Sequence, residues 1–197
     1  MTRLLLASGN AKKLAELRRL VEAAGLALEV VGLGDVLPYP EPVEDGDTFE
    51  DNALIKARAG ARMTGLPTLA DDSGIEIDVL NRMPGVRSAR WAGPGACDAD
   101  NLELLLRQLV DVEPRRRRGR FVCAMALVDG TNEHVVRRTM EGALVDVPRG
   151  TNGFGYDPAF VTDGQTRTNA ELSPDEKDAI SHRGQAVRAF VAWLKES

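Results

Sequence analysis

The chain has 197 residues, of which 43% are hydrophobic and 28% charged, and its formal net charge is -5. This composition is typical of a globular protein, and the length favours a single domain over residues 1–197 with two lobes. The negative charge argues against a nucleic-acid partner, and no apolar run reaches the ~18 residues that a membrane span needs.

The predicted elements alternate between strands and helices. Hydrophobic periodicity and turn residues predict a strand at 3–7, a helix at 11–24, a strand at 28–31, a helix that starts at Thr48, short strands at 68–70 and 75–79, a helix at 100–110, strands at 121–128, 134–139 and 143–147, and C-terminal helices after Ser173. Strands and helices mixed in this order predict an α/β fold with a mixed sheet.

Three of the helices begin with an N-capping signal. Such a signal is a Ser, Thr or Asp whose side chain accepts a backbone N–H, followed three positions later by an acidic partner. The pairs are Thr48 with Asp51, Asp100 with Glu103, and Ser173 with Glu176. In the helix that starts at Thr48, one face carries Asn52, Lys56 and Gly60.

The first candidate site is the turn Ser8-Gly9-Asn10 and the helix start Ala11-Lys12-Lys13. A turn exposes backbone N–H groups, a helix N-terminus carries partial positive charge, and lysine adds a full charge, so the segment is suited to hold phosphate. The glycine spacing differs from that of a P-loop. The residues alone leave open a plain strand–helix corner with Asn10 as N-cap.

The second candidate site is Asp71-Asp72-Ser73-Gly74, at the end of a buried strand. Two adjacent carboxylates repel each other unless a cation is present, and ligation by carboxylates alone indicates a hard ion such as Mg²⁺. Because side chains alternate along a strand, only one of Asp71 and Asp72 can face a given ligand. The acidic loop from Glu41 to Asp45 could bring a second ligand. An Asx turn and a solvated acidic loop are the structural alternatives.

Two further candidate sites lie near the C-terminus. Glycines in Gly153-Phe154-Gly155-Tyr156-Asp157-Pro158 let the backbone approach a flat ligand, on which an aromatic ring can stack. Lys177 and the segment Ser181-His182-Arg183-Gly184 could hold phosphate or a base edge at the junction of two helices. The alternatives are aromatic rings that fill the core and a His–Arg pair that caps a helix.

Other polar residues receive a structural interpretation. Cys97 and Cys123 have no metal-ligand spacing, so we expect reduced thiols, and with no signal peptide at the N-terminus we expect a cytoplasmic protein. We expect a structural role for His134 and a solvated loop for the basic run 115–118.

The four motifs, in this order, closely resemble the inosine triphosphate pyrophosphatase family. The likeness extends to the segments 47–57, 84–90 and 120–123, so it covers nearly the whole chain. Each motif alone is only moderately specific, whereas the ordered set is highly specific. The resemblance implies an elongated mixed β-sheet flanked by helices, two lobes with a central cleft, and a homodimer. It also implies Mg²⁺-dependent hydrolysis of a purine nucleoside triphosphate (ITP, dITP or XTP) to the monophosphate and pyrophosphate.

Carried over by matching position, the resemblance also assigns residue roles. Asp72 would be the general base and a metal ligand, with Glu44 as the preferred second ligand and Glu41 as the alternative. The substrate-binding residues would be Ser8, Gly9, Asn10, Ala11, Lys12, Lys13, Lys56, Ser73, Phe154, Gly155, Tyr156, Asp157, Lys177, His182 and Arg183. Two alternative functions remain: a pyrophosphatase for other modified nucleotides, and a nucleotide-binding sensor that does not hydrolyse.

Overall fold

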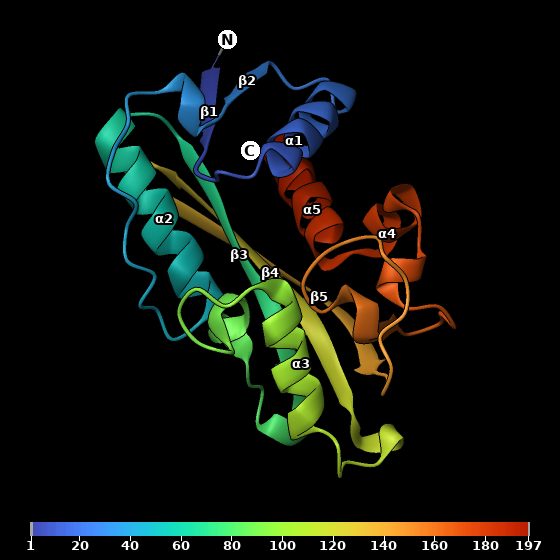
Figure 1. Cartoon of the computed structure of the whole chain (residues 1–197). Helices are drawn as coiled ribbons and strands as arrows, with labels where there is room; N and C mark the ends of the chain where they lie inside the picture. Colours follow the sequence, from blue (N-terminus) through green and yellow to red (C-terminus); the bar gives the residue numbers. More distant parts are fainter. Residues whose placement is uncertain (1, 197) are drawn as a thin grey trace. The chain divides into compact units, whose positions relative to one another are not determined.

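A computed structural model describes residues 2–196, except for the side chain of Lys12. Its six strands form one sheet in the order β2-β1-β3-β4-β5-β6 (Figure 1). The strands are β1 (Thr2–Leu6), β2 (Leu28–Val31), β3 (Thr68–Ile77), β4 (Arg118–Asp129), β5 (Asn132–Leu144) and β6 (Phe160–Thr162). β1 is parallel to both β2 and β3, whereas β5 and β6 are antiparallel. The predicted α/β fold with a mixed sheet is therefore confirmed.

The chain divides into two compact units. Unit 1 contains residues 1–72, 123–137 and 185–197, and unit 2 contains residues 73–122 and 138–184. Strands β3, β4 and β5 each pass from one unit to the other, so the sheet is common to both. Along β3 the change falls between Asp72 and Ser73.

The core of unit 1 is formed by two amphipathic helices and the central strands. α1 (Ala11–Ala23) contributes Leu17 and Val21, and α5 (His182–Glu196) contributes Phe190, none more than 2% exposed. They pack in one cluster with Leu69 of β3 and residues of β1 and β4. This apolar cluster holds the N-terminal end of α1 beside the end of β1, where the first candidate site begins.

α2 (Phe49–Thr64) also belongs to unit 1 and begins as the sequence predicts. Thr48 accepts the N–H of Asp51 at 3.1 Å, and the Asp51 carboxylate accepts the N–H of Thr48 at 3.2 Å, which completes a capping box. The face with Ala53 and Ala57 is fully buried, so the helix backbone lies close to the sheet. A methyl group on Gly60 would lie 2.6 Å from Cγ2 of Thr68, which shows how close that packing is.

Unit 2 contains α3 (Asp98–Gln108) and α4 (Pro174–Ile180). Its core joins residues of α3, β3 and β4 around Phe160, which is fully buried. The prediction of Asp100 as an N-cap is wrong. α3 starts two residues earlier, Cys97 is the N-cap, and Asp100 accepts the N–H of Cys97 at 2.8 Å from the third helical position. A second acidic residue in the first turn, Asp98, made the true start ambiguous in the sequence.

The expected break in the strand at residues 71–74 is absent, because β3 runs unbroken from Thr68 to Ile77. A doublet of aspartates followed by Ser-Gly favours a turn locally. Here the strand continues because its backbone is paired within the sheet and because each aspartate has a cationic partner, Lys13 for Asp71 and Lys56 for Asp72. β5 likewise replaces the two strands expected at 134–139 and 143–147.

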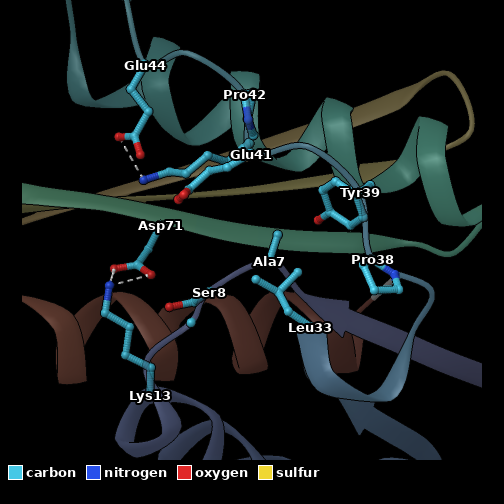
Figure 2. Close-up of a pocket in the computed structure, with 12 residues that line it drawn as sticks. Ala7, Ser8, Lys13, Leu33, Pro38, Tyr39, Glu41, Pro42, Glu44 and Asp71 are labelled. Atoms are coloured by element: carbon cyan, nitrogen blue, oxygen red, sulfur yellow. Dashed lines mark hydrogen bonds and ion pairs between the residues drawn. The ribbon is translucent and has the colours of Figure 1, made fainter.

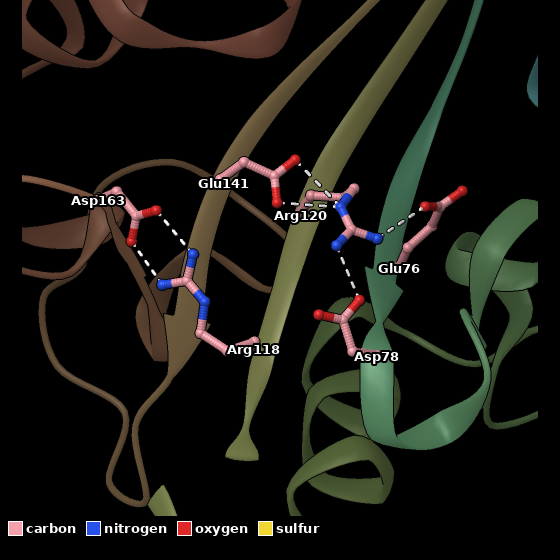
Figure 3. A network of polar contacts seen from close by, with 6 residues as sticks. All are labelled: Glu76, Asp78, Arg118, Arg120, Glu141 and Asp163. Carbon is pink, nitrogen blue, oxygen red and sulfur yellow. Dashed lines mark hydrogen bonds and ion pairs between the residues drawn. The ribbon is translucent and has the colours of Figure 1, made fainter. Parts of the chain in front are cut away.

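The basic run 115–118 is not a solvated loop throughout. Arg117 is 5% exposed, donates to the carbonyl of Val112 at 2.7 Å and pairs with Asp146. Arg118 lies in β4 and makes a two-pronged contact with Asp163, at 2.6 and 2.7 Å (Figure 3). These arginines therefore stabilise unit 2 by fixing its loops to the sheet.

Arg120 is the centre of an ion network on the sheet of unit 2. Its guanidinium contacts Glu141 at 3.0 Å, Asp78 at 2.8 Å and Glu76 at 3.4 Å (Figure 3). These carboxylates come from β3, its C-terminal end and β5, on both sides of β4. One guanidinium thereby joins three neighbouring strands.

We expect Glu176→Gln to lower stability at neutral pH but not in strong acid. Hydrogen bonds from Arg167 and then from Ser173 hold the pKa of the Glu176 carboxyl at about 2, below its usual 4.5. A lowered carboxyl pKa stabilises the fold above the unfolded pKa, and this contribution is lost as the pH falls through the folded value. Urea unfolding should show a difference between variant and wild type that shrinks from pH 4.5 to pH 2. Asp175→Asn, which removes a neighbouring charge in the same turn, is the control.

Candidate active site

Unit 1 contains a pocket of about 400 Å³ at the turn after β1. Its lining residues come from the turn after β1, α1, the loop 33–44, α2 and β3: Ala7, Ser8, Gly9, Lys13, Leu33, Pro38, Tyr39, Glu41, Pro42, Glu44, Lys56 and Asp71. Figure 2 shows Lys13 and Asp71 on one side of β3 and Glu44 on the other, with Leu33, Pro38 and Tyr39 at one end. The pocket is therefore charged at one end and apolar at the other.

Asp71 is paired with Lys13 from the first turn of α1. The Lys13 ammonium lies 2.6 and 2.8 Å from the two carboxylate oxygens, and the Asp71 side chain is only 3% exposed. A buried carboxylate is costly without a partner, and this lysine neutralises it. Both groups line the pocket, so they place one cation and one anion at the N-terminus of α1.

Asp72 points to the other face of β3, as strand alternation requires. One carboxylate oxygen accepts a hydrogen bond from Asn52 at 3.0 Å, and the other lies 3.6 Å from the Lys56 ammonium. Lys56 also donates to Glu44 at 3.1 Å. Lys56 thus contacts both residues that the sequence predicts as metal ligands, Glu44 and Asp72, and Glu41 lines the same pocket.

The donor set of this cluster fits a hard cation. Glu44 and Asp72 offer carboxylate oxygens on the two sides of one lysine ammonium, 29% and 14% exposed. Among residues 2–196, no group of three or more His, Cys, Asp and Glu side chains is arranged to hold a metal. Such a site would be completed by water and substrate oxygens, which is the usual manner of Mg²⁺.

The turn before α1 is a capped strand–helix corner that also lines the pocket. The Asn10 side chain accepts the N–H of Lys13 at 3.3 Å, so Asn10 caps the helix. Ser8 accepts the N–H of Asn10 at 3.3 Å, while Ser8 and Gly9 line the pocket. Ala11 opens α1, and the side chain of Lys12 lies outside the described part of the chain.

Unit 2 contains a second, smaller pocket of about 120 Å³. The eight residues predicted there to hold the nucleoside and touch the substrate all line it: Ser73, Phe154, Gly155, Tyr156, Asp157, Lys177, His182 and Arg183. Gly74, Ser88, Ala89, Asp98, Asn101 and Phe121 complete the lining. Residues from β3, α3, β4, the glycine-rich loop, α4 and α5 therefore meet at one concave site.

Asp157 fixes the glycine-rich loop from within. It is 2% exposed, accepts the N–H of Phe154 at 2.9 Å and forms an ion pair with Lys177. A methyl group on Gly153 would lie 2.3 Å from the Asp157 carboxylate, and Gly153 has a φ of 77°. Glycine is thus required at this position both for its conformation and for the close approach of the carboxylate.

Two aromatic contacts shape the pocket of unit 2. The Phe154 ring is 58% exposed, and Lys177 Nζ and the Arg183 guanidinium lie 5.0 and 5.7 Å from its centroid. The His182 ring stacks on Phe121 with centroids 5.1 Å apart and an interplanar angle of 12°. The pocket therefore offers an exposed aromatic face with two cations near it, a suitable surface for a flat heterocycle.

Tyr156 and Ser181 stabilise the backbone around this pocket through hydrogen bonds to Ser88 and Gly184. Tyr156 donates to the carbonyl of Ser88 at 2.8 Å; burial, followed by the charge of Asp98, raises the pKa of its hydroxyl, so it remains a neutral donor. Ser181 accepts the N–H of Gly184 at 3.0 Å and so caps α5. His182 and Arg183 therefore occupy the first turn of that helix.

Sequence reasoning missed several residues around the two pockets. Asp98 accepts the N–H of Gly155 at 2.9 Å, a contact over 57 positions that no local pattern indicates. Phe121 lies in a predicted strand and in the segment 120–123 of the family resemblance, but neither pattern indicates that its ring lines a pocket. Tyr39 lies in a proline-rich loop without periodicity; burial and then the charge of Glu41 raise its pKa. For Asn52 the sequence offers a better signal, because an amide four positions before Lys56 lies on the same helical face as that lysine.

A capped turn with lysines and carboxylates in one unit, and an aromatic, cationic pocket in the other, are features suited to an α/β protein that binds nucleotides. The sequence profile of the Ham1 family matches residues 4–193. The chain therefore belongs to the Ham1 family, which confirms the resemblance recognised in the motifs.

Similar proteins cover the full length of the chain. A relative from Cutibacterium acnes, named dITP/XTP pyrophosphatase, is 60% identical over 97% of this chain and 95% of its own. A solved structure from Mycobacterium abscessus, named nucleoside-triphosphatase / dITP/XTP pyrophosphatase, is 53% identical with a TM-score of 0.85, over 98% of this chain and 100% of that one. The HAM1 protein from Coxiella burnetii is 42% identical with a TM-score of 0.93, over the whole of both chains.

We expect Lys13→Met to destabilise the protein by about 3–5 kcal/mol, because it leaves the buried Asp71 carboxylate without its cation. Urea unfolding measures the change. The double variant Lys13→Met/Asp71→Asn should recover part of it, since the neutral amide needs no counter-charge. A Lys13→Met protein as stable as wild type would contradict this interpretation of the pair.

Proposed function

We propose that this protein hydrolyses the deaminated purine nucleoside triphosphates ITP, dITP and XTP to the monophosphate and pyrophosphate. The observation that carries the proposal is the full-length similarity to relatives named dITP/XTP pyrophosphatase, at 60% identity for the one from Cutibacterium acnes. The two pockets support it, since one offers cations to phosphate and the other an aromatic face to a base. Removal of deaminated purines from the nucleotide pool is the corresponding role.

In this proposal the triphosphate binds in the pocket of unit 1. Ser8 and Gly9 offer a hydroxyl and backbone N–H groups, while Lys13 and Lys56 offer full positive charge. Each lysine is already paired with a carboxylate, so each is held in place before the substrate arrives. Such preorganised charges stabilise the transition state of phosphoryl transfer more than flexible ones would.

Asp72 acts on the attacking water in this proposal. It orients the water or takes its proton while the oxygen forms a bond to the α-phosphorus. The bond from that phosphorus to the bridging oxygen breaks, and pyrophosphate leaves with the electron pair. Mg²⁺ held by Asp72 and Glu44 would neutralise phosphate charge in this reaction. Glu44 is preferred to Glu41 because Lys56 contacts both Glu44 and Asp72.

Base selection is assigned to the pocket of unit 2. Phe154 offers a face on which the purine stacks, and Arg183 offers donors to a 6-oxo group. The 6-amino group of adenine would meet these donors with its own N–H groups, which leaves polar groups unpaired. Asp157, with its carboxylate engaged by the loop and Lys177, positions the loop that carries Phe154.

We also propose that the protein is cytoplasmic and acts as a homodimer. Neither of the described cysteines, Cys97 and Cys123, forms a disulfide, as expected in a reducing compartment. The proposed substrates belong to the cellular nucleotide pool. No helix among residues 2–196 is long and apolar enough to cross a membrane. The alternative of a sensor that binds nucleotide without hydrolysis is disfavoured, because a binder of an anion gains nothing from carboxylates beside it unless a metal intervenes.

We expect Asp72→Asn to lower kcat for ITP by about 10²- to 10⁴-fold, because the amide cannot accept the proton of water. The variant should fold, since its amide oxygen can still accept from Asn52. Release of pyrophosphate at saturating Mg²⁺ measures the rate. Asp129→Asn, an exposed position at the end of β4, is the charge-matched control. Near-wild-type turnover of Asp72→Asn would exclude the proposed role.

We expect kcat/KM for ITP to exceed that for ATP by about 100-fold or more, given the cost of unpaired polar groups in the base pocket. A panel of ITP, dITP, XTP, ATP, GTP and modified pyrimidine triphosphates, with and without Mg²⁺, measures it. Equal values for ITP and ATP would contradict the proposed selectivity. A preference for pyrimidines would favour the pyrophosphatase for other modified nucleotides.

A further inference from the structure

Beyond the residues expected to meet the substrate, one buried side chain joins the parts of the unit 1 site. Asn52 lies in the first turn of α2, is 1% exposed, and contacts both β3 and the loop before α2. We propose that Asn52 is a positioning residue that fixes Asp72 relative to the segment Glu44–Gly46. This inference rests on the proposed function, in which Asp72 and Glu44 serve the reaction.

The side-chain amide of Asn52 forms hydrogen bonds through both its nitrogen and its oxygen. Its nitrogen donates to the Asp72 carboxylate at 3.0 Å, and its oxygen accepts the N–H of Gly46 at 2.9 Å. Only a side chain with a donor and an acceptor on one planar group makes both contacts. An aspartate would lack the donor and add a negative charge beside Asp72, and a leucine would lack both groups.

The lack of a side chain at Gly46 allows its N–H to approach the Asn52 amide. A methyl group there would lie 2.8 Å from the Asn52 amide oxygen and 2.6 Å from Cβ of Asp51. Asp51 cannot withdraw freely, because it forms the capping box with Thr48. Gly46 does not adopt a left-handed φ, so this position requires the absence of a side chain and not an unusual backbone conformation.

Lys56 provides the second connection one helical turn later. It contacts Glu44 at 3.1 Å and the other oxygen of Asp72 at 3.6 Å. The two oxygens of Asp72 therefore have separate partners on the same face of α2, and the plane of the carboxylate is fixed. The loop is fixed at two points, Glu44 by charge and Gly46 by its backbone.

Asn52 acts through these neighbours. The described lining of the unit 1 pocket includes Glu44 and Lys56 but neither Asn52 nor Asp72. Asp72 contacts that lining through Lys56, and Asn52 contacts Gly46, two residues after Glu44. Partners that orient ligating carboxylates commonly change metal affinity or activity by about 10- to 100-fold when removed. A side chain that is buried only for packing would change stability and leave these properties intact.

The test breaks the same contact from both sides. Asn52→Leu removes the amide from α2, and Gly46→Ala pushes the loop away from it. Gly34→Ala is the matched control, because a methyl group there meets nothing within 4 Å and Gly34 lies on the same connection between β2 and α2. Three properties are measured below the unfolding transition of every variant: kcat and KM for ITP, the affinity for Mn²⁺ alone by calorimetry, and the unfolding midpoint.

We expect both Asn52→Leu and Gly46→Ala to lower kcat and Mn²⁺ affinity by about 10-fold or more, with a smaller change in KM. The double variant should lose little more than Asn52→Leu alone, since both substitutions break the same hydrogen bond between Gly46 and Asn52. Gly34→Ala should match wild type. If Asn52→Leu does not fold, Gly46→Ala decides the question alone.

Unchanged kcat and Mn²⁺ affinity in the folded variants, with only a lower unfolding midpoint, would overturn the positioning role. Additive losses in the double variant would also overturn it. Failure of the proposed function looks different: the wild type would not hydrolyse ITP, whereas the dependence of Mn²⁺ affinity on Asn52 and Gly46 would still be measurable.

Discussion

Two adjacent carboxylates on a buried strand are the constraint on which the rest of the structure depends. Asp71 and Asp72 point to opposite faces of β3, so no single cation can neutralise both. The fold supplies one lysine to each face, Lys13 from the start of α1 and Lys56 from α2. Both helices, which apolar packing holds against the sheet, thereby meet this electrostatic requirement, and their two lysines line the pocket.

The sequence predicted the helices well where periodicity and caps agree. α1, α2 and α4 begin at the residues that their capping patterns indicate. It failed at residues 71–74, where local preference for a turn competes with pairing in the sheet and with lysines that are distant in sequence. Partners separated by 58 positions, such as Lys13 and Asp71, leave no local pattern to read.

Part of the lining of the two pockets could be predicted from ordered motifs, but which of these residues hold the backbone in place could not. Asp157 was expected to touch the nucleoside, yet its carboxylate is engaged by the N–H of Phe154 and by Lys177. Asn10 was expected at the phosphates, yet its side chain caps α1. In both cases the side chain of a motif residue accepts a hydrogen bond from a backbone N–H, and only the three-dimensional structure reveals this contact.

The network around Arg120 implies unequal tolerance to sequence change. Three carboxylates share one guanidinium, so the loss of Glu76, Asp78 or Glu141 leaves the other two paired and relieves repulsion between them. The loss of Arg120 leaves three negative charges facing one another with no counter-charge from this residue. The acidic positions can therefore vary one at a time over evolution, whereas the arginine is constrained by all three at once.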